Sequence, residues 1–442
     1  MSASPLSAET VPSGMPLLGR DGRSAPPIRI VHLGLGAFHR SHQAWFTHRA
    51  PDAAEWGIAS FTGRRPHAAT TLAAQDSLFT LVERGSEDDR FEVIGSIAEA
   101  VDGADTTRLA QLLAAPTTAI VTLTVTEAVY EQIDTHSPLS RLLHGLDARR
   151  AAGAGPIAVV SCDNLAANGR VAHATVLRIA ERVSPALVAW ISENVSFVST
   201  SVDRITPRTS MQDRTLVAAR CGYRDDSPVV AEPFASWILC GEFPAGRPSW
   251  ENAGAEFVED IEPFENRKLW FLNGAHSLMA YAGQLREHTT VADAFADPVC
   301  RDAVESFWNE AARHLPHPEL NVPEYRQALA ERFANQRIAH SLAQIAADGT
   351  TKLRMRSIPV LRAELAAGRT GLATARVLAA WMDFVSSGVQ IQDPLAGALR
   401  EVETPGGHTG TADLLRLVDA PLANDTLTVQ RIFELRGTLT GP

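Results

Sequence analysis

The spacing of apolar residues changes once along this chain, near residue 225. Before that point, short apolar runs rich in β-branched residues alternate with amphipathic segments of helical length, a pattern typical of parallel strands connected by helices. After it, long Ala- and Leu-rich segments predict helices. Strands are predicted at 28–33, 56–61, 78–83, 91–97, 120–125, 157–161 and 195–199, and the longest helices at 298–314, 323–347 and 371–387. The pattern therefore predicts an α/β domain followed by a mostly α-helical domain.

The domain limits follow from the same change of pattern. We expect a flexible N-terminal extension at 1–26, an α/β domain at 27–255 and an α-helical domain at 256–442. The length of 442 residues and the hydrophobic content of 45% are sufficient for two substantial cores. The extension has no apolar segment of signal-peptide length, and no run of about 18 apolar residues occurs in the chain. We therefore expect a cytoplasmic protein without a membrane span.

Charge and cysteine content narrow the class of partner. The formal net charge of −11 at pH 7 argues against binding to nucleic acid or to an anionic membrane, because no excess of cations is available for phosphates. The four cysteines have no CxxC spacing, so the sequence predicts neither a metal site nor a disulfide framework. The remaining expectation is a small-molecule ligand. Nothing in the sequence indicates an oligomeric state.

The first predicted strand runs directly into the glycine-containing segment GLGAFHR. Strand, glycine turn and helix are the context of a dinucleotide-binding site. Gly34 would permit the tight turn, and Gly36 would let the backbone approach a pyrophosphate held by the amides that open the helix. The third glycine of a GxGxxG pattern is replaced by His39. The predicted cofactor-binding residues are Leu33, Gly34, Leu35, Gly36, Ala37, Phe38, His39 and Arg40.

The end of the second predicted strand bears on the choice of dinucleotide. An acid there would bind the ribose 2′-hydroxyl of NAD, whereas this chain has Arg64 and Arg65, which suit the 2′-phosphate of NADP. A solvated turn explains the two arginines equally well. From these residues, NAD and NADP both stay open.

Polar residues follow three of the later predicted strands. Glu127 comes just after the strand at 120–125, Asn164 lies in SCDNLAANG after 157–161, and Asp203 lies in VDRITP after 195–199. The carboxyl ends of parallel strands are where open α/β sheets bind ligands. The alternative for each residue is a loop cap or a local ion pair.

The apolar segment 268–283, KLWFLNGAHSLMAYAG, carries three polar residues of chemical interest. On an ideal helix Lys268, Asn273 and His276 fall within an arc of about 140°, so that they can face one pocket. A lysine in apolar surroundings has a lowered pKa and is a candidate general base. Alternatively, Lys268 extends to solvent, Asn273 caps a neighbouring element and His276 is a core histidine.

The ordered set of motifs GLGAFHRSHQA, TVTEAVY, SCDNLAANG, VDRITP, EPFASWIL and KLWFLNGAHS resembles the polyol-specific long-chain dehydrogenases, the mannitol dehydrogenase family. That family includes mannitol 2-dehydrogenase, arabinitol dehydrogenases and the reductases of fructuronate and tagaturonate. The resemblance extends from about residue 28 into the C-terminal helices. It implies a Rossmann-type N-terminal domain, an α-helical C-terminal domain and an active site between them.

The resemblance also implies roles for individual residues. The catalytic residues of the family fall on Lys268, Asn164, Asn273 and His276. Residues for substrate binding or proton relay fall on Asp203, Glu265, Glu127 and Lys352, the last in a Gly/Thr loop. The chain departs from the family where an arginine is expected and Gln344 stands, and its segment between Glu127 and Asn164 is shorter. These departures affect the substrate more than the reaction.

The implied chemistry is hydride transfer from a secondary alcohol to a nicotinamide, without a metal. Lys268 as a neutral amine would accept the hydroxyl proton, and the amides of Asn164 and Asn273 would stabilise the developing alkoxide. His276 would orient the substrate oxygen or the lysine, and Glu265 would pass the proton outward. The resemblance favours NAD as cofactor and a polyol with its ketose, such as mannitol and fructose, as substrates. The alternatives are a hexuronate reductase of the same family, a dehydrogenase of the 6-phosphogluconate type and a cofactor-binding regulator without activity.

Overall fold

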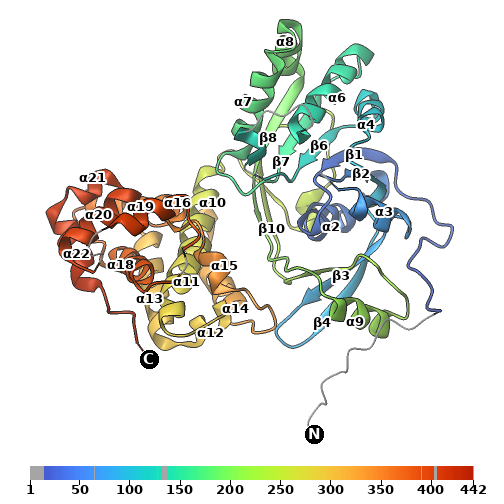
Figure 1. Ribbon diagram of the computed structural model, residues 1–442. Helices are drawn as coiled ribbons and strands as arrows, with labels where there is room; N and C mark the ends of the chain where they lie inside the picture. The colour runs from blue at the N-terminus through green and yellow to red at the C-terminus, as the bar shows by residue number, and fades with distance from the viewer. Residues whose placement is uncertain are drawn as a thin grey trace. The chain divides into compact units, whose positions relative to one another are not determined.

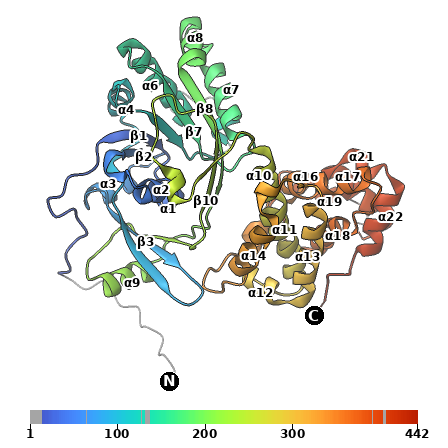
Figure 2. The same ribbon diagram turned by 180° about the vertical axis from the view of Figure 1, so that it is seen from behind.

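The computed structural model describes residues 14–63, 65–126, 128–131, 137–389, 391–402 and 406–441. They form two compact units, and the division lies between Glu262 and Pro263 (Figures 1 and 2). The first unit is built on parallel strands and the second is mostly helical. The predicted fold class is therefore confirmed.

The main sheet of the first unit has eight strands. They are β1 Ile28–Leu33, β2 Gly57–Phe61, β5 Ile97–Val101, β6 Ile120–Leu123, β7 Ile157–Ser161, β8 Val195–Asp203, β10 Ser236–Cys240 and β11 Glu256–Phe257. Their spatial order is β11-β10-β8-β7-β6-β1-β2-β5. The six strands from β5 to β8 are all parallel, and their order is that of a dinucleotide-binding fold. β10 is antiparallel to β8 and ends the parallel series.

Helices cover both faces of this sheet (Figures 1 and 2). Neighbouring residues of a strand point to opposite faces, and the two faces form separate cores: Ile30 and Ile120 lie in one, Val31 and Val121 in the other. Burial on both faces explains why the strands are continuous apolar runs. The helices are α1 Ala37–Ser41, α2 Gln43–Arg49, α3 His67–Ala73, α4 Thr106–Ala114, α5 Ala128–Glu131, α6 Pro138–Ala152, α7 Asn168–Ala180, α8 Pro185–Asn194 and α9 Met211–Cys221.

A second, three-stranded sheet lies in the same unit. It contains β3 Phe79–Arg84 and β4 Asp89–Ile94, paired as the predicted antiparallel hairpin, and β9 Val229–Ala231. The predicted strand at 91–97 is interrupted at Gly95 and Ser96, and Ile97 begins β5 of the main sheet. One expected strand is therefore shared by two sheets.

The second unit is organised around one buried helix, α11 Ala275–Leu285. It packs against α12 Val291–Ala296, α13 Pro298–Ala312, α15 Leu342–Ala346, α16 Gly349–Arg356 and α18 Leu372–Ser386. Two segments precede it, α10 Glu262–Arg267 and the π-helix η3 Lys268–Gly274. The remaining helices are α14 Val322–Phe333, α17 Ile358–Ala366, α19 Ala396–Glu401, α20 His408–Val418, α21 Ala420–Ala423 and α22 Thr426–Leu435.

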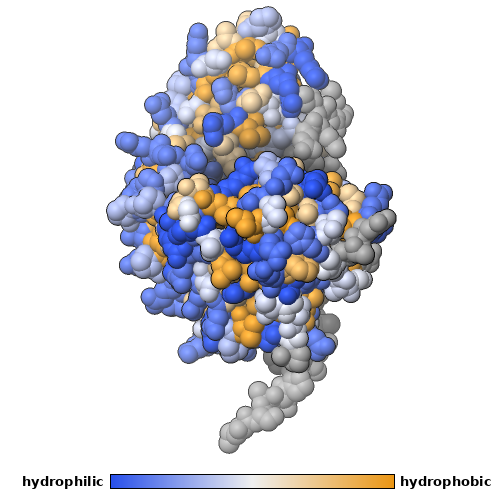
Figure 3. All heavy atoms as spheres, turned by 90° about the vertical axis from the view of Figure 1, so that its left-hand side faces the viewer, coloured by the Kyte–Doolittle hydropathy of each residue, from blue (hydrophilic) through white to orange (hydrophobic). Residues whose placement is uncertain are grey.

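Two expectations for this unit are wrong. The segment 323–347 is not one helix, because α14 ends at Phe333 and α15 begins only at Leu342. Lys352 does not lie in a loop but in the middle of α16. Within the described part of the chain no helix is long and apolar enough to cross a membrane. Polar and apolar residues are interspersed over the face shown in Figure 3.

Candidate active site

The turn between β1 and α1 is fixed by its neighbouring strands. The amides of Gly34 and Leu35 donate to the carbonyl of Phe61, at 3.0 and 2.8 Å, and the Thr124 hydroxyl donates to the Gly34 carbonyl at 2.9 Å. Gly34 has φ +122°, and a Cβ at this position would lie 2.1 Å from the carbonyl oxygen of Thr124. Only glycine fits here.

The next glycine leaves room for a ligand. Among the described residues, a Cβ built on Gly36, the residue before α1, would meet only the Gly34 carbonyl, at 3.6 Å. The first amides of a helix have no acceptor within the helix, and such amides suit a pyrophosphate. The open space, the pinned turn and the strand order together fit a dinucleotide along 33–40.

His39 replaces the third glycine with a buried ring stack. Its ring lies on that of His32, with centroids 3.3 Å apart and planes inclined by 6°. His39 Nε2 pairs with the Ser60 hydroxyl at 2.9 Å, and His32 pairs with Thr122 and Thr124 at 2.7 and 2.9 Å. Burial lowers the pKa of His32 to about 3 and that of His39 well below its usual range. The two rings are therefore neutral, and they fasten α1 to the sheet.

Thr62, directly after β2, makes a hydrogen bond within the protein. The Thr62 hydroxyl accepts a hydrogen bond from the Gly103 amide at 2.8 Å, and Arg141 of α6 donates to the Gly103 carbonyl. Arg65 is exposed, and Arg64 lies outside the described residues. The structure therefore adds no cofactor contact to the sequence at this position.

Asp163 joins the ends of β6 and β7. Its carboxylate accepts hydrogen bonds from the Val125 amide at 2.5 Å, the Ser161 hydroxyl at 3.0 Å and the Tyr130 hydroxyl. Burial raises the pKa of Asp163 to about 6, although these hydrogen bonds act in the opposite direction. The adjacent Asn164 is exposed at the carboxyl end of β7. Asp163 thus fixes the backbone that presents Asn164.

Asn168, four residues after Asn164, also fixes the backbone of this segment. Its side chain is fully buried and donates to the carbonyls of Asp163 and Thr200, at 2.8 and 2.7 Å. Its own oxygen accepts from the Thr200 amide at 2.8 Å. In SCDNLAANG the flanking polar residues are therefore structural, and Asn164 is the one left at the surface of the sheet edge.

Asp203 and Arg204 occupy the end of β8 and the residue after it. Asp203 is buried as the last residue of the strand. The Arg204 guanidinium is also buried and pairs with Glu83 at 2.6 Å, and it donates to the Ser41 carbonyl at 2.7 Å. Arg204 therefore forms a buried ion pair that ties the end of β8 to β3.

Lys268 and Asn273 lie on a π-helix, which corrects the geometry expected from an ideal α-helix. In a π-helix the hydrogen bonds join residues five apart, so these two residues, five positions apart, lie close to the same side of the axis. Both are partly buried. The carbonyl of Phe271 accepts a further bond from the Trp308 indole at 2.9 Å. A Cβ on Gly274 would lie 2.5 Å from the Phe307 ring, so this segment packs directly on α13.

His276 is the second residue of α11 and lies beside a group of basic residues. Its ring contacts those of Phe333 and His340, with centroids 5.0 and 4.9 Å apart. Burial lowers the pKa of His276 well below its usual range, and nearby positive charges act in the same direction. Within the residues that the structure describes, His276 Nε2 has no hydrogen-bond partner. A buried polar atom of this kind indicates a place for a ligand or water.

Arg356 of α16 is bonded to one residue before and one residue after His276 in the sequence. Its Nη1 donates to the Asn273 carbonyl at 3.3 Å and to the Ser277 hydroxyl at 3.0 Å. Lys352, one turn earlier in the same helix, donates to the Ile345 carbonyl at 3.1 Å. Sequence reasoning missed Arg356, because an arginine at the end of a polar helix looks like a solvated residue.

The predicted site residues fall into two groups, one in each unit. The first unit carries 33–40, Asn164 and Asp203, and the second carries the lysine segment, Lys352 and Glu265, which lies in α10. Glu127 lies outside the described residues, and Gln344 is exposed on α15. Among the residues described, no three His, Cys, Asp or Glu side chains are grouped to hold a metal.

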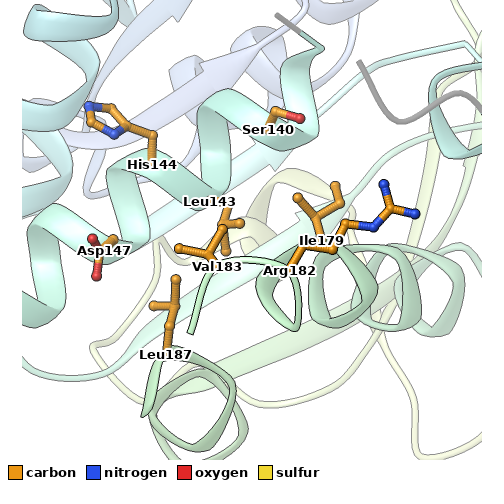
Figure 4. A pocket seen from close by; sticks show the side chains of 8 residues that line it. All are labelled: Ser140, Leu143, His144, Asp147, Ile179, Arg182, Val183 and Leu187. Atoms are coloured by element: carbon orange, nitrogen blue, oxygen red, sulfur yellow. The ribbon is translucent and has the colours of Figure 1, made fainter. Parts of the chain in front are cut away.

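A pocket of about 360 Å³ in the first unit contains none of these residues (Figure 4). It lies among α6, the end of α7 and the start of α8. Four apolar and four polar side chains line it: Leu143, Ile179, Val183 and Leu187, and Ser140, His144, Asp147 and Arg182. It is therefore separate from the candidate site.

The lysine content of the chain is itself a signal in the sequence that points to Lys268 and Lys352. The 442 residues contain 38 arginines and only two lysines, Lys268 and Lys352. Arginine serves as the cation almost everywhere, yet it cannot release its proton and is larger than an ammonium group. Positions that retain lysine in such a chain are candidates for a function that arginine cannot perform.

Comparison with known proteins agrees with the two-unit structure. The family model of the mannitol dehydrogenase Rossmann domain matches residues 28–252, and that of the mannitol dehydrogenase C-terminal domain matches 260–435. D-mannonate oxidoreductase of Escherichia coli is 36% identical, over 85% of this chain and 84% of that protein. D-arabinitol 4-dehydrogenase of Ralstonia nicotianae is 35% identical, over 96% of this chain and 95% of that protein.

A solved structure shows the same architecture. Mannitol 2-dehydrogenase of Pseudomonas fluorescens, in a ternary complex with NAD and D-mannitol, matches with a TM-score of 0.78 and 31% identity, over 96% of this chain and 93% of that one. Both family models, the curated relatives and the fold lead to one conclusion. The chain belongs to the mannitol dehydrogenase family of oxidoreductases.

Proposed function

We propose that the chain is an NAD-dependent oxidoreductase that interconverts a secondary alcohol of a polyhydroxylated substrate and the corresponding ketone, with Lys268 as general base. The observation that carries this proposal is the position of Lys268. One of only two lysines in the chain lies on a π-helix, five residues before Asn273, and this π-helix runs directly into α11, whose residues 275–283 are all buried. π-Helical segments occur frequently at functional sites.

Each residue has a role in the proposed reaction. In the oxidation direction the Lys268 amine accepts the hydroxyl proton, and the amides of Asn164 and Asn273 donate to the developing alkoxide. His276, a neutral imidazole, contacts the substrate oxygen, and Glu265, three residues before the lysine, passes the proton towards solvent. Residues 33–40 would hold NAD, which would supply the acceptor for the hydride of the carbinol carbon. Asp203 and Lys352 contact the rest of the substrate.

NAD is the proposed cofactor because the Pseudomonas fluorescens enzyme was solved with NAD and the turn at Gly34 and Gly36 has the geometry that a dinucleotide requires. For the substrate, the names of the relatives include polyols and a sugar acid. A polyol and its ketose, with mannitol and fructose as the reference pair, is the first class to test. The sugar acids are the second.

The test is a spectrophotometric assay of NADH, with polyols and aldonates in one direction and ketoses and hexuronates in the other. We expect turnover with at least one pair. Lys268→Arg retains the positive charge but cannot act as a base, so it should lose activity as completely as Lys268→Ala while NAD binding is retained. Activity in the arginine variant, or NAD binding without turnover of any substrate, would contradict the proposal.

The two-lysine composition permits a direct test of the base. In protein labelled with 13C at lysine Cε, only two side-chain signals are expected, and Lys268→Ala identifies one of them. If this lysine is the base, its signal titrates with the same midpoint as kcat/KM. A midpoint unrelated to the rate profile would assign the base elsewhere.

A further inference from the structure

Thr124, the residue directly after β6, is bonded to the glycine turn that joins β1 to α1 (residues 33–36). Its hydroxyl donates to the Gly34 carbonyl at 2.9 Å. The amide of the same peptide unit, that of Leu35, donates to the Phe61 carbonyl at 2.8 Å. One peptide unit of the turn is therefore held from two sides, through its carbonyl by Thr124 and through its amide by the last residue of β2.

This peptide unit needs to be held because Gly34 does not define its orientation. Gly34 has φ +122°, and glycine adopts positive and negative φ with little difference in energy. The bond from Thr124 selects one orientation of the Gly34 carbonyl. It thereby sets the direction in which the chain enters Gly36, beside which the described residues leave open space.

His32 determines the direction of the Thr124 hydroxyl. A carbonyl oxygen only accepts hydrogen bonds and a hydroxyl has a single proton, so the Thr124 proton lies in the bond to Gly34. The Thr124 oxygen must then accept its other bond, at 2.9 Å, from Nε2 of His32. It follows that Nε2 carries the proton of the His32 ring.

The second nitrogen of His32 has a separate partner. Burial lowers the pKa of His32 to about 3, so the ring is neutral and its Nδ1 has no proton. Nδ1 accepts a hydrogen bond from the Thr122 hydroxyl at 2.7 Å. Three hydrogen bonds therefore run in one direction, from Thr122 through His32 and Thr124 to the Gly34 carbonyl.

His39 keeps the His32 ring in this orientation. The two rings are stacked, with centroids 3.3 Å apart, and both are fully buried. His39 lies in α1, just beyond the glycine turn, and is itself paired with the Ser60 hydroxyl at 2.9 Å. A rotation of the His32 ring would break the stack and leave buried nitrogens without partners. The position that lacks the third glycine thus supports the turn from behind.

We propose that Thr124 is a positioning residue for NAD: its hydroxyl, oriented by the Nε2–H group of His32, holds the Gly34 carbonyl so that the glycine turn has its cofactor-binding conformation before the cofactor arrives. This inference rests on the proposed function in one respect, the binding of NAD along 33–40. A turn that is already ordered lowers the conformational cost of binding. Thr124 is the first residue of the motif TVTEAVY, in which sequence reasoning gave a role to Glu127 only.

The test measures the Kd of NAD by calorimetry in the absence of substrate. Thr124→Val replaces the hydroxyl with a methyl group and should raise the Kd about tenfold, the effect expected from the loss of one hydrogen bond. Thr124→Ser keeps the hydroxyl and should bind NAD within about threefold of wild type. With NAD at saturation, kcat should be the same in wild type and both variants, because Thr124 acts on the turn and not on the reacting atoms.

Thr122→Val is the matched control. It makes the same substitution in a buried threonine that bonds the same imidazole, but at the nitrogen remote from the turn. Both valine variants lose a hydrogen bond to His32, so both should unfold at a lower temperature. Only Thr124→Val should also weaken NAD binding, whereas Thr122→Val should change the Kd by less than about twofold.

The 15N signals of histidine test the orienting role of His32 in protein without cofactor. The chain has 14 histidines, and comparison with His32→Gln identifies the signals of His32. They should show the proton on Nε2, and this pattern should persist from about pH 8 to about pH 5, where an ordinary histidine titrates. A proton on Nδ1 would reverse the chain of hydrogen bonds and overturn the inference.

The outcomes separate this inference from the proposed function. An unchanged Kd in Thr124→Val, or a Kd in Thr124→Ser as high as that in Thr124→Val, would overturn the positioning role and leave the dehydrogenase proposal intact. A lower kcat with an unchanged Kd would also overturn it, because it would place Thr124 in the chemical step. If Thr124→Val does not fold, Thr124→Ala is compared with Thr124→Ser, since these two differ by the hydroxyl alone. Wild-type protein that binds neither NAD nor NADP would contradict the proposed function itself.

Discussion

Gly274→Ala tests whether the catalytic segment depends on direct packing against α13. A Cβ at this position would lie 2.5 Å from Cε1 and 2.9 Å from Cζ of Phe307. The Phe307 ring is fully buried, so it has no free space into which to move. Inserting a methyl group into a packed core costs about 1–3 kcal/mol. The same change inside a helix gains about 0.5–1 kcal/mol of helix propensity.

Gly397 in α19 supplies a matched control. It is also a helical glycine, but a Cβ there would have nothing within 4 Å in the part of the chain that the structure describes. Gly397→Ala should therefore stabilise its unit by the propensity gain alone. The difference between the two variants isolates the contact with Phe307 and should be about 1–3 kcal/mol in the free energy of unfolding, which corresponds to about 2–4 °C in Tm per kcal/mol for a unit of this size.

The assay is thermal unfolding of the full chain, followed by tryptophan fluorescence. Because the two units can unfold separately, the change should appear in one transition only. Phe307→Leu removes the two ring atoms that clash, so in the double variant the penalty of the alanine should shrink by about 1 kcal/mol or more. Equal Tm values for the two alanine variants, or additive effects in the double variant, would refute the packing argument.

Three shorter predictions concern the first unit. Burial raises the pKa of Asp163 in the folded protein to about 6. The contribution of Asp163 to stability is therefore largest below pH 3.8 and is lost as the pH rises to about 6. The difference in urea midpoint between wild type and Asp163→Asn should shrink over this pH range. Asn168→Asp places a carboxylate against the Thr200 carbonyl, and should cost about 1–3 kcal/mol at pH 7 and less in acid. The pKa values of His32 and His39 are lowered, so stability falls as the pH drops below about 6.5, by about 1.4 kcal/mol per pH unit for each histidine; calorimetry of His39→Gln should show one proton fewer taken up on unfolding.

The parallel sheet could be predicted from the sequence because its physical causes are local. β1, β6 and β7 are buried on both faces, so they appear as short continuous apolar runs, and the segments between them have the length of crossover helices. The turn at Gly34 could also be predicted, since a close strand contact and positive φ both demand glycine there. The hairpin was predicted, but its placement in a separate sheet was not, because β9, more than a hundred residues later, completes that sheet.

Long-range hydrogen bonds explain what the sequence did not reveal around Asn164. Asp163 and Asn168 belong to the same short motif as Asn164, and all three have polar side chains of similar size. Only the positions of Val125 and Thr200, which are distant in sequence, decide that two of these residues are buried in hydrogen-bond networks and one is exposed. No local pattern distinguishes these roles.

The π-helix at Lys268–Gly274 shows where a periodicity argument fails for an identifiable reason. Counting at 3.6 residues per turn spreads the polar residues of this segment over a wide arc, because it assumes that each amide bonds to the fourth residue before it. The wider turn of the π-helix brings Lys268 and Asn273 towards one side. The carbonyls of Phe271 and Asn273 accept hydrogen bonds from the side chains of Trp308 and Arg356. These two side chains stabilise an otherwise unfavourable backbone from outside the segment. The geometry of the proposed catalytic pair is therefore a property of the whole helical unit, and substitutions at Trp308 or Arg356 should affect it although neither residue is needed for proton transfer.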